Sequence, residues 1–340
     1  MGRKFIMKAA IFDKGCIEVK EVDVPNRNSS DVLIKVKYAG ICGSDLYHSS
    51  GKNPRVKPPI ILGHEYVGEI LETAAGAMCK TGDRVVVFPL LSCGNCDSCQ
   101  QGYYHICSNL RLLGVHKNGG FAEFSVVPIQ NVFVLPANIE LQHAALIEPI
   151  AVAIHAVRLS GLKPGETVVI CGSGPIGLSI GLVARNAGAR QVIVTELNEY
   201  RLKIAQELGF KIVDVNIEDP VLKVRNITNG RGADVVFECV GSSSISKVIA
   251  SLARSRGRIV IVGLYKGLTE IDLLQVSFKE LKIIGSKVYQ REDFTKAINF
   301  LISRSVGEII NPKVMSLDSI NEAFDILRHS PEVVKIILDI

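Results

Sequence analysis

The 340-residue sequence lacks any long, uninterrupted apolar run that would predict a membrane span. Its most apolar window, residues 168–184, reads VVICGSGPIGLSIGLVA and is broken by glycines and by Pro175. A spanning helix needs roughly 20 predominantly apolar residues. We therefore expect this window to be a buried strand that leads into a turn and a helix, and we expect no membrane association.

Other signals are missing as well. The N-terminal MGRKFIMKAAIF has neither the sustained apolar stretch nor the small-residue cleavage site of a secretory signal. The net charge of +5 is small and dispersed, and no basic block with interleaved aromatic residues predicts a nucleic-acid partner. No internal repeat or low-complexity segment is visible. We expect a cytoplasmic protein whose thiols stay reduced.

The chain is too long for one ordinary core, so its length predicts two domains. In residues 8–90, segments that alternate apolar and polar residues are separated by Pro, Asn and Gly. This pattern is typical of strands joined by turns. From about residue 160, apolar strands alternate with helical segments, which predicts right-handed βαβ units in a parallel sheet. The final VVKIILDI resembles the N-terminal half. We predict an α/β protein in which a mainly-β catalytic domain, residues 1–150 and 296–340, is interrupted by a nucleotide-binding domain, residues 151–295.

The glycine-rich GSGPIG follows a predicted strand and opens a predicted helix. In a dinucleotide fold, glycines at the positions of Gly172, Gly174 and Gly177 allow a tight turn, a close approach to pyrophosphate and helix packing. The helix start, at Pro175 and Ile176, suits an anion because its N–H groups are free.

Glu196 ends the next predicted strand, 19 residues after Gly177. A carboxylate there accepts hydrogen bonds from ribose hydroxyls and repels the extra phosphate of NADP, so we predict NAD. The alternative is that the glycines only form a turn and Glu196 only caps it.

Four of the nine cysteines lie in one loop, residues 91–108, with the spacing C-x2-C-x2-C-x7-C. They are Cys93, Cys96, Cys99 and Cys107. Four thiolates at this spacing suit tetrahedral Zn²⁺ in a closed, structural site. Disulfides conflict with a reducing compartment, and a redox CxxC lacks its thioredoxin-like context. An iron–sulfur cluster remains open as an alternative.

Further candidate ligands occur in GICGSDLYH, GHEYVG and ALIEPIAVAIHA. Cys42 stands in a glycine-flanked turn, and His64 and Glu65 follow a glycine. Glu148 precedes a proline that suits the first turn of a helix. Each residue alone is more often a core or surface residue than a ligand, but their combination with a nucleotide fold favours a site.

GHE followed by VG, the four-cysteine lobe, GSGPIG and ALIEP, in this order, resemble the motifs of the zinc-dependent medium-chain dehydrogenase/reductase family. The resemblance runs from about residue 8 to the end. The branch resembled contains sorbitol, xylitol and threonine dehydrogenases and bacterial sugar-acid, starvation-sensing-type dehydrogenases. It implies a GroES-like catalytic domain with an inserted Rossmann domain, two zinc ions per chain, NAD, and a homodimer or homotetramer.

The resemblance implies that Cys42 and His64 hold a catalytic zinc, with Glu65 or Glu148 as the third protein ligand. Family members differ in whether such a Glu binds the metal directly or holds its water. Asp45 is expected to orient His64.

Ser44 matches the Ser or Thr that relays the hydroxyl proton in this family. The histidine that usually follows three residues later is replaced by Tyr47, and His48 is one residue further along. The proton therefore leaves either through His48 or through water.

Cofactor contacts are also implied by the resemblance. Arg201 is expected beside the adenine, and Val262, Gly263 and Leu264 near the nicotinamide. Lys287 stands in GSKVYQREDF where the family has Arg. Lysine keeps the positive charge but lacks the planar guanidinium group, which can donate two parallel hydrogen bonds.

We therefore predict a zinc- and NAD-dependent dehydrogenase that oxidises the secondary alcohol of a polyol, sugar acid or related hydroxy compound to a ketone by hydride transfer. Zinc with an open coordination position would act as a Lewis acid on the substrate hydroxyl. Two alternatives are an NADPH-linked aldehyde or ketone reductase and a non-catalytic NAD-binding relative. The sequence does not name the alcohol.

Overall fold

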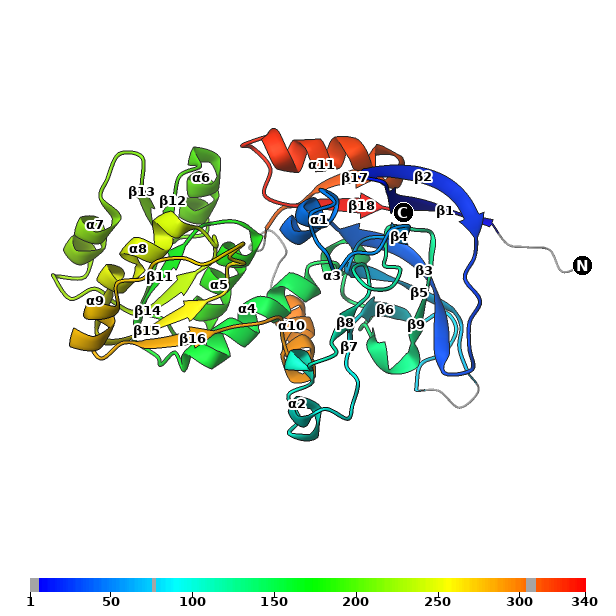
Figure 1. The fold of residues 1–340 in the computed structure, drawn as a ribbon, viewed down its shortest axis with the longest axis horizontal. Coiled ribbons are helices and arrows are strands. Elements are labelled where there is room, and N and C mark those ends of the chain that lie inside the picture. The colour runs from blue at the N-terminus through cyan, green and yellow to red at the C-terminus, as the bar shows by residue number, and fades with distance from the viewer. Residues whose placement is uncertain (1–5, 75–77, 304–309) are drawn as a thin grey trace, which may run out of the picture. The chain divides into compact units, whose positions relative to one another are not determined.

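A computed structural model describes residues 6–74, 78–303 and 310–340, which form two compact units (Figure 1). The first unit contains the described residues of Met1–Glu148, Gln290–Gly307 and Asn311–Ile340, and the second those of Pro149–Tyr289 and Glu308–Ile310. Residues 1–5, part of the N-terminal segment in which no secretory signal is expected, lie outside the described ranges. Within those ranges, no helix has the length and apolar character needed to cross a membrane.

The first unit is built from three sheets. A three-stranded sheet has the order β2-β1-β4, and a two-stranded sheet pairs β7 with β8. A seven-stranded sheet has the order β10-β6-β5-β3-β18-β17, with β9 also paired to β3. The strands are β1 (Ile6–Asp13), β2 (Cys16–Asp23), β3 (Asp31–Gly40), β4 (Ile60–Ile61), β5 (Glu65–Glu72), β6 (Arg84–Val87), β7 (Leu90–Leu91), β8 (Arg111–Leu112), β9 (Phe124–Pro128), β10 (Val132–Val134), β17 (Lys313–Ser316) and β18 (Ile336–Asp339).

The C-terminal strand completes the seven-stranded sheet. Strand β18 runs antiparallel to β3, with Ile337 opposite Gly40 and Leu338 opposite Ala39. Its first three residues, Ile336 to Leu338, are fully buried. The last segment of the chain therefore pairs with the N-terminal half, which its sequence resembles.

Short helices cover these sheets. They are α1 (Gly43–His48), α2 (Asp97–Gln100), α3 (Leu141–Ala144), α10 (Arg291–Ile302) and α11 (Ile320–His329), with single turns η1 (Tyr104–Ile106), η2 (Ile129–Asn131) and η4 (Leu317–Ser319). Helix α11 buries Phe324, whose ring meets that of Phe121 edge-on. Helix α10 belongs to the first unit because Phe294 packs against Phe88 and Phe133, with ring centroids 5.3 and 5.1 Å away.

The second unit contains one six-stranded parallel sheet of order β13-β12-β11-β14-β15-β16. All five residues of β11 are buried, in keeping with its β-branched, apolar sequence. The strands are β11 (Thr167–Cys171), β12 (Gln191–Glu196), β13 (Lys211–Asp214), β14 (Ala233–Glu238), β15 (Ala253–Ile261) and β16 (Lys282–Gly285).

Helices alternate with these strands: α4 (Ile147–Ser160), α5 (Pro175–Asn186), α6 (Glu199–Glu207), α7 (Pro220–Ile227), α8 (Ser243–Leu252) and α9 (Leu273–Phe278). The strand order reverses direction between β11 and β14, and open parallel sheets bind ligands at the carboxyl ends of strands at such a point. The mainly-β unit and the doubly wound parallel sheet together have the predicted α/β architecture.

Candidate functional site

Cys42, His64 and Glu65 lie together in the first unit, with one ligand atom from each residue within 4.8 Å of the others. Cys42 follows β3 and is the N-cap of α1, while Glu65 begins β5. Gly40, near the end of β3, pairs with Glu65 across the antiparallel ladder. Strand pairing thus places these residues at one sheet edge. A thiol, an imidazole and a carboxylate at this spacing fit a zinc ion.

Asp45 connects this cluster to two histidines. Its Oδ2 accepts a hydrogen bond of 2.9 Å from the backbone N–H of Cys42, and its Oδ1 lies 3.4 Å from Nδ1 of His64 and 3.7 Å from Nδ1 of His48. Burial alone would raise the pKa of Asp45, but the two histidines outweigh burial and hold this pKa well below its usual range. Because Nδ1 of His64 faces the carboxylate, Nε2 is the ring nitrogen left for a cation.

Lys335 is a residue of this site that the sequence reasoning missed. It is 2% exposed, its ammonium pairs with the Glu65 carboxylate, and it donates a 2.9 Å hydrogen bond to the carbonyl of Ile41. Burial alone would lower the pKa of Lys335, but the carboxylate of Glu65 and the thiol of Cys42 raise it above its usual value. One signal was present in the sequence, namely a lysine inside the apolar run VVKIIL.

Glu148 lies in the first turn of α4 and is 6% exposed. Among the described residues, its carboxylate is not part of the group whose ligand atoms all lie within 4.8 Å of one another. It is nonetheless close enough for its charge to help raise the pKa of Lys335. The structure therefore places Glu65 next to Cys42 and His64, with Lys335 bound to it, and Glu148 farther out.

The two candidate proton-relay residues, Ser44 and His48, both lie on α1. They are four residues apart, so they share one face of the helix. Ser44 is half-buried and His48 is 4% exposed. The hydroxyl of Tyr47, which occupies the usual histidine position, donates to the carbonyl of Lys52 at 3.3 Å. This geometry favours His48 over Tyr47 as the partner of Ser44.

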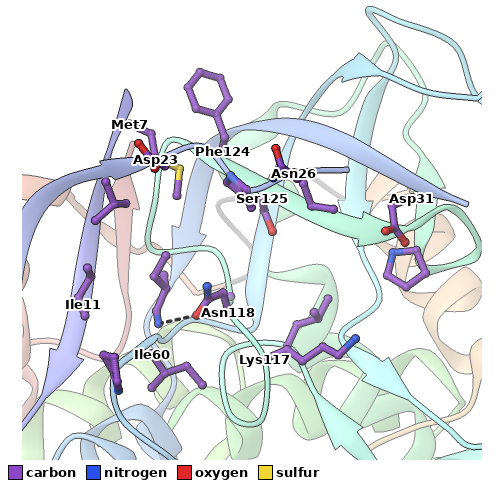
Figure 2. A pocket seen from close by; sticks show the side chains of 18 of the residues that line it. Met7, Ile11, Asp23, Asn26, Asp31, Ile60, Lys117, Asn118, Phe124 and Ser125 are labelled. Atoms are coloured by element: carbon purple, nitrogen blue, oxygen red, sulfur yellow. Dashed lines mark hydrogen bonds between the residues drawn. The ribbon is translucent and has the colours of Figure 1, made fainter. Parts of the chain in front are cut away.

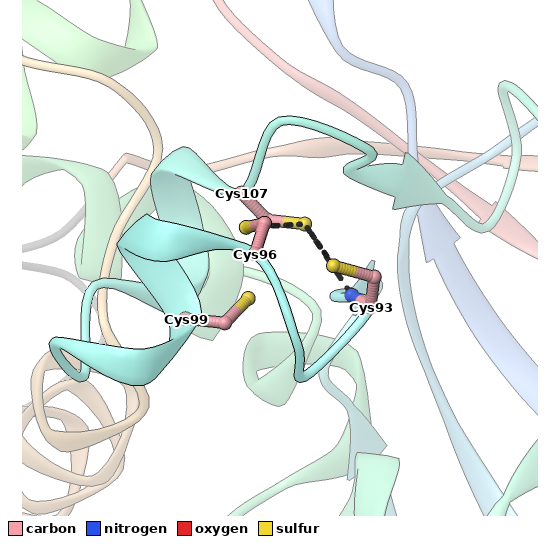
Figure 3. Close-up of side chains that lie close together, drawn as sticks. All are labelled: Cys93, Cys96, Cys99 and Cys107. Carbon is pink, nitrogen blue, oxygen red and sulfur yellow. Dashed lines mark hydrogen bonds between the residues drawn. The ribbon is translucent and has the colours of Figure 1, made fainter.

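The four cysteines of the 91–108 lobe converge as the spacing predicts (Figure 3). Sγ of Cys107 lies 3.4 Å from Sγ of Cys93 and 3.8 Å from Sγ of Cys96, and all four thiols are free. A tetrahedral Zn²⁺ with Zn–S bonds near 2.3 Å places its sulfurs about 3.8 Å apart. The four sulfurs therefore fit one tetrahedral metal ion.

Local backbone geometry builds this lobe. Cys96 is the N-cap of α2, and Gly94 and Gly102 adopt φ of 76° and 84°, which glycine adopts without strain. Backbone N–H groups of Ser108 and Cys99 lower the pKa of the Cys96 thiol to about 6. Since the thiolate is the metal-binding form, these N–H groups favour a metal site.

The glycine loop of the second unit has the geometry that a dinucleotide requires. Gly172, with φ of 93°, directly follows β11, and Gly174 is the N-cap of α5, whose first two residues are Pro175 and Ile176. A Cβ at Gly177 would lie 1.9 Å from the carbonyl oxygen of Gly172. The loop and helix can approach one another this closely only because residue 177 has no side chain.

Glu196 ends β12 beside this loop, as predicted from the sequence. Its Oε2 accepts hydrogen bonds from the N–H and the hydroxyl of Ser173, at 2.7 and 3.1 Å, and its Oε1 accepts from the N–H groups of Leu197 and Asn198. The carboxylate thus holds the glycine loop against β12. These four donors use the lone-pair sites of both oxygens, so a ribose hydroxyl that bound Glu196 would replace one of them, such as the hydroxyl of Ser173.

The other predicted cofactor residues lie in the same unit. Arg201 is on α6, half-buried, and Lys287 is exposed between β16 and α10. Val262, Gly263 and Leu264 follow β15 directly, with Leu264 exposed.

Glu238, at the end of β14, is a second residue that the sequence reasoning missed. Its buried carboxylate accepts hydrogen bonds of 2.8 Å from the N–H groups of Val240 and Gly241. Its backbone carbonyl accepts hydrogen bonds from the N–H groups of Val262 and Gly263. Glu238 therefore ties the loop after β14 to the loop expected at the nicotinamide.

A separate cavity of about 640 Å³ lies in the first unit (Figure 2). Strand and loop residues line it, including Asp23, Asp31, Lys117 and Ser125. None of the predicted catalytic, metal-binding or cofactor-binding residues lines this cavity, so it is distinct from the candidate active site.

Comparison with known proteins gives two family matches. The model described as "Alcohol dehydrogenase GroES-like domain" matches residues 28–137, and the model described as "Zinc-binding dehydrogenase" matches residues 175–303. Together they cover more than half of the chain. They confirm the predicted fold class of a GroES-like domain with a Rossmann domain.

Relatives match over almost the whole length. The 2-dehydro-3-deoxy-L-galactonate 5-dehydrogenase of Pseudoalteromonas atlantica is 38% identical over 92% of both chains. The sorbitol dehydrogenase of Bacillus subtilis is 37% identical over 87% of this chain and 86% of its own. A solved structure of a protein assigned as a zinc-binding dehydrogenase, from Sinorhizobium meliloti 1021 and bound to NADP, has a TM-score of 0.90 at 34% identity, covering 99% of this chain and 100% of that one.

Replacing one thiol of the lobe should remove one metal ion. We expect Cys96→Ser to lower the zinc content from two ions per chain to one and to lower the melting temperature by about 5–10 °C. The reason is that a neutral hydroxyl is a poor zinc ligand. Cys16→Ser, at an exposed cysteine outside both clusters, is the control and should retain both ions. Metal analysis and thermal unfolding measure the two effects, and an unchanged zinc content in Cys96→Ser would contradict the metal site.

Removing the buried ammonium should leave an unpaired buried carboxylate. We expect Lys335→Met to lower the free energy of unfolding by about 3–5 kcal/mol, because Glu65 loses its partner. The double variant Lys335→Met/Glu65→Gln should recover at least half of that loss. Lys20→Met, which breaks an exposed pair with Glu18, is the control and should change little. Urea unfolding measures all of these, and a double variant less stable than Lys335→Met would argue against the pairing.

Proposed function

Because the chain belongs to the zinc-dependent medium-chain dehydrogenase/reductase family and is thus an oxidoreductase, we propose that it oxidises the secondary alcohol of a polyol, sugar acid or related hydroxy compound to a ketone, with NAD as the acceptor. The observation that carries this proposal is the cluster of Cys42, His64 and Glu65, with His64 held by the buried Asp45. The substrate class is supported by the names of relatives, which include a sugar-acid and a sorbitol dehydrogenase.

The proposed catalytic zinc ligands are Cys42 and His64, with Glu65 or Glu148 as the third. Bound there, zinc would supply Lewis-acid activation of the substrate hydroxyl, and NAD would supply the acceptor for its hydrogen. Asp45 keeps the His64 ring in one orientation, since its Oδ1 faces Nδ1. Lys335 holds Glu65 in place by pairing with its carboxylate.

The hydroxyl proton has a route along α1. We place Ser44 as the group that accepts this proton, and His48, one helical turn later, as the group that passes it on. Support comes from the i, i+4 spacing of the two residues on α1. Asp45 lies 3.7 Å from Nδ1 of His48, so a positive charge on that ring would be stabilised.

The proposed cofactor site is the glycine loop with Pro175 and Ile176, together with Glu196, Arg201, Val262 to Leu264 and Lys287. NAD is proposed over NADP because the Glu196 carboxylate at the end of β12 would repel a phosphate on the adenosine ribose. The related structure from Sinorhizobium meliloti is bound to NADP, so the choice of dinucleotide needs a direct test.

We further propose the catalytic zinc-binding domain as residues 1–150 with 296–340 and the NAD-binding domain as residues 151–295. Support comes from the two compact units, whose main boundaries fall after Glu148 and after Tyr289, although Glu308–Ile310 group with the second unit. Two zinc ions per chain are proposed from the two ligand clusters. A cytoplasmic location is proposed from the nine free thiols, and a homodimer or homotetramer from the family resemblance.

Turnover should depend on the metal. We expect the purified protein to produce NADH from at least one compound of a panel of polyols and sugar acids. Removal of catalytic zinc by a chelator should lower kcat by at least about 100-fold, and added zinc should restore it. Absorbance at 340 nm follows the reaction, with metal analysis alongside. Full activity in protein shown to lack catalytic zinc would refute the mechanism.

The charge of Glu196 should set the dinucleotide preference. We expect NADH to bind at least about 10-fold more tightly than NADPH, because the carboxylate repels the extra phosphate. Glu196→Gln removes the charge and keeps the shape and one accepting oxygen, so it should narrow that ratio. Its amide nitrogen cannot accept the N–H groups that the other oxygen accepts, so circular dichroism should confirm that the variant stays folded. Cofactor fluorescence titration gives both dissociation constants. Equal affinities in the natural protein would favour the reductase alternative.

A further inference from the structure

The sheet topology of the second unit divides a bound dinucleotide into two halves. The strand order β13-β12-β11-β14-β15-β16 reverses direction between β11 and β14. A dinucleotide lies across such a point at the carboxyl ends of the strands, with one mononucleotide on each side. The glycine loop after β11 and Glu196 at the end of β12 are the proposed partners of the pyrophosphate and the adenosine ribose. The nicotinamide riboside therefore falls on the loops that follow β14 and β15.

These loops are in direct contact with one another. A Cβ at Gly263 would lie 2.3 Å from the backbone nitrogen of Gly241, and a Cβ at Gly241 would lie 2.6 Å from the carbonyl oxygen of Leu264. The loop after β14 also touches the glycine loop, because a Cβ at Gly172 would lie 2.6 Å from Cγ2 of Val240. A displacement of the loop after β14 would therefore disturb both of its neighbours.

Glu238, the last residue of β14, supplies the hydrogen-bond acceptors at this junction. Its Oε1 accepts hydrogen bonds of 2.8 Å from the N–H groups of Val240 and Gly241. Its backbone carbonyl accepts hydrogen bonds of 2.9 and 2.8 Å from the N–H groups of Val262 and Gly263. The residue is 0% exposed. One buried residue thus accepts two consecutive N–H groups from each of the two loops.

The Glu238 side chain acts here through its shape and its accepting oxygen. Its Oε2 lies against Gly263, since a Cβ at that glycine would be 2.5 Å away. Burial raises the pKa of Glu238, and the N–H groups of Gly241 and Val240 oppose this effect without cancelling it. The charged form is thus disfavoured at this position. A neutral side chain of the same length with one accepting oxygen should therefore replace the carboxylate.

The two loops carry exposed apolar side chains. Val240 is 49% exposed, and Leu264, which directly follows Gly263, is 62% exposed. Binding sites for small molecules are lined mainly by apolar side chains on a largely pre-formed backbone. The planar ring of a nicotinamide is a group that such side chains can contact. The hydrogen bonds to Glu238 fix the backbone from which these two side chains extend.

We infer that Glu238 is a positioning residue for the nicotinamide half of NAD, because it holds the loops after β14 and β15 in the conformation that this half of the cofactor binds. It acts through the backbone of these loops and not by contact with the cofactor. The inference rests on the proposed NAD-dependent oxidation and adds a residue to its cofactor site. Loops released from Glu238 would have to become ordered when NAD binds, and that loss of entropy would weaken binding.

The test separates the two halves of the cofactor. NADH reports on both halves, whereas ADP carries only the adenosine and pyrophosphate groups. We expect Glu238→Met, which removes the accepting oxygens, to weaken NADH binding at least about 10-fold and ADP binding no more than about twofold. Glu238→Gln keeps one accepting oxygen, so it should weaken NADH binding no more than about threefold. Isothermal titration calorimetry measures each dissociation constant.

Asp234→Leu is the matched control on the same strand. Asp234 is buried near the start of β14, and its Oδ2 accepts a 2.8 Å hydrogen bond from the N–H of Thr167. The variant likewise removes a buried acceptor of a backbone N–H group, but at the amino end of the strand. It should lower the melting temperature and leave the ratio of the NADH and ADP dissociation constants unchanged.

A second pair of variants tests the junction even if Glu238→Met does not fold. Gly263→Ala would place a Cβ 2.5 Å from Oε2 of Glu238, so it should push the two loops apart. We expect it to weaken NADH binding at least about fivefold more than ADP binding. Gly267→Ala is its control, because a Cβ at Gly267 would meet no atom within 4 Å among the described residues. This variant should change neither dissociation constant.

Several results would overturn the inference. Equal weakening of NADH and ADP in Glu238→Met would indicate a general loss of structure. An unchanged ratio of the two dissociation constants in Glu238→Met or in Gly263→Ala would show that the junction does not position the nicotinamide. Equal losses in Glu238→Gln and Glu238→Met would show that the accepting oxygen has no part in it.

Failure of the proposed function gives different results. If no alcohol of the panel is oxidised but the variants change NADH and ADP binding as expected, the proposed oxidation is refuted and the positioning role stands. If the natural protein binds neither NADH nor ADP, the proposed dinucleotide site is refuted, and the inference fails with it.

Discussion

The antiparallel pairing of β3 with β5 is the constraint on which the candidate active site depends. Cys42 follows one strand and Glu65 begins the other, so the ladder places a thiol and a carboxylate at one edge. Gly40 makes the fit possible, since a Cβ there would lie 2.2 Å from Oε2 of Glu65. Strand β18 pairs with the other side of β3 and brings Lys335 to the same edge. One sheet thus assembles candidate ligands and a counter-charge from three distant parts of the chain.

The electrostatics of this edge suit a cation. Asp45, Glu65 and Glu148 are buried and the thiol of Cys42 is half-buried, so acidic groups outnumber the one buried lysine of the described residues, Lys335, that pairs with Glu65. Buried charges are costly unless they are paired or coordinate a metal. A divalent cation beside Cys42 and His64 would balance this excess, which agrees with the zinc-binding description of the family.

In the second unit, two glutamates organise the carboxyl edge of the parallel sheet. Glu196 binds the glycine loop after β11, and Glu238 joins the loops after β14 and β15. Both use carboxylate oxygens to accept backbone N–H groups that would otherwise lack partners at strand ends. The result is a set of loops whose backbone is held in place at the point where the strand order reverses, where open parallel sheets bind ligands.

The sequence by itself determined the features that depend on residues close together in the chain: the βαβ alternation, the glycine loop with Glu196, and the four-cysteine lobe. Their geometry depends on turn chemistry and strand periodicity, which are local properties. Only the tertiary structure decided that Glu65 lies nearer Cys42 and His64 than Glu148 does, that Lys335 neutralises Glu65, and that Glu238 joins two loops. These juxtapositions depend on strand register and on packing between segments far apart in the chain, and no local pattern of residues specifies either one.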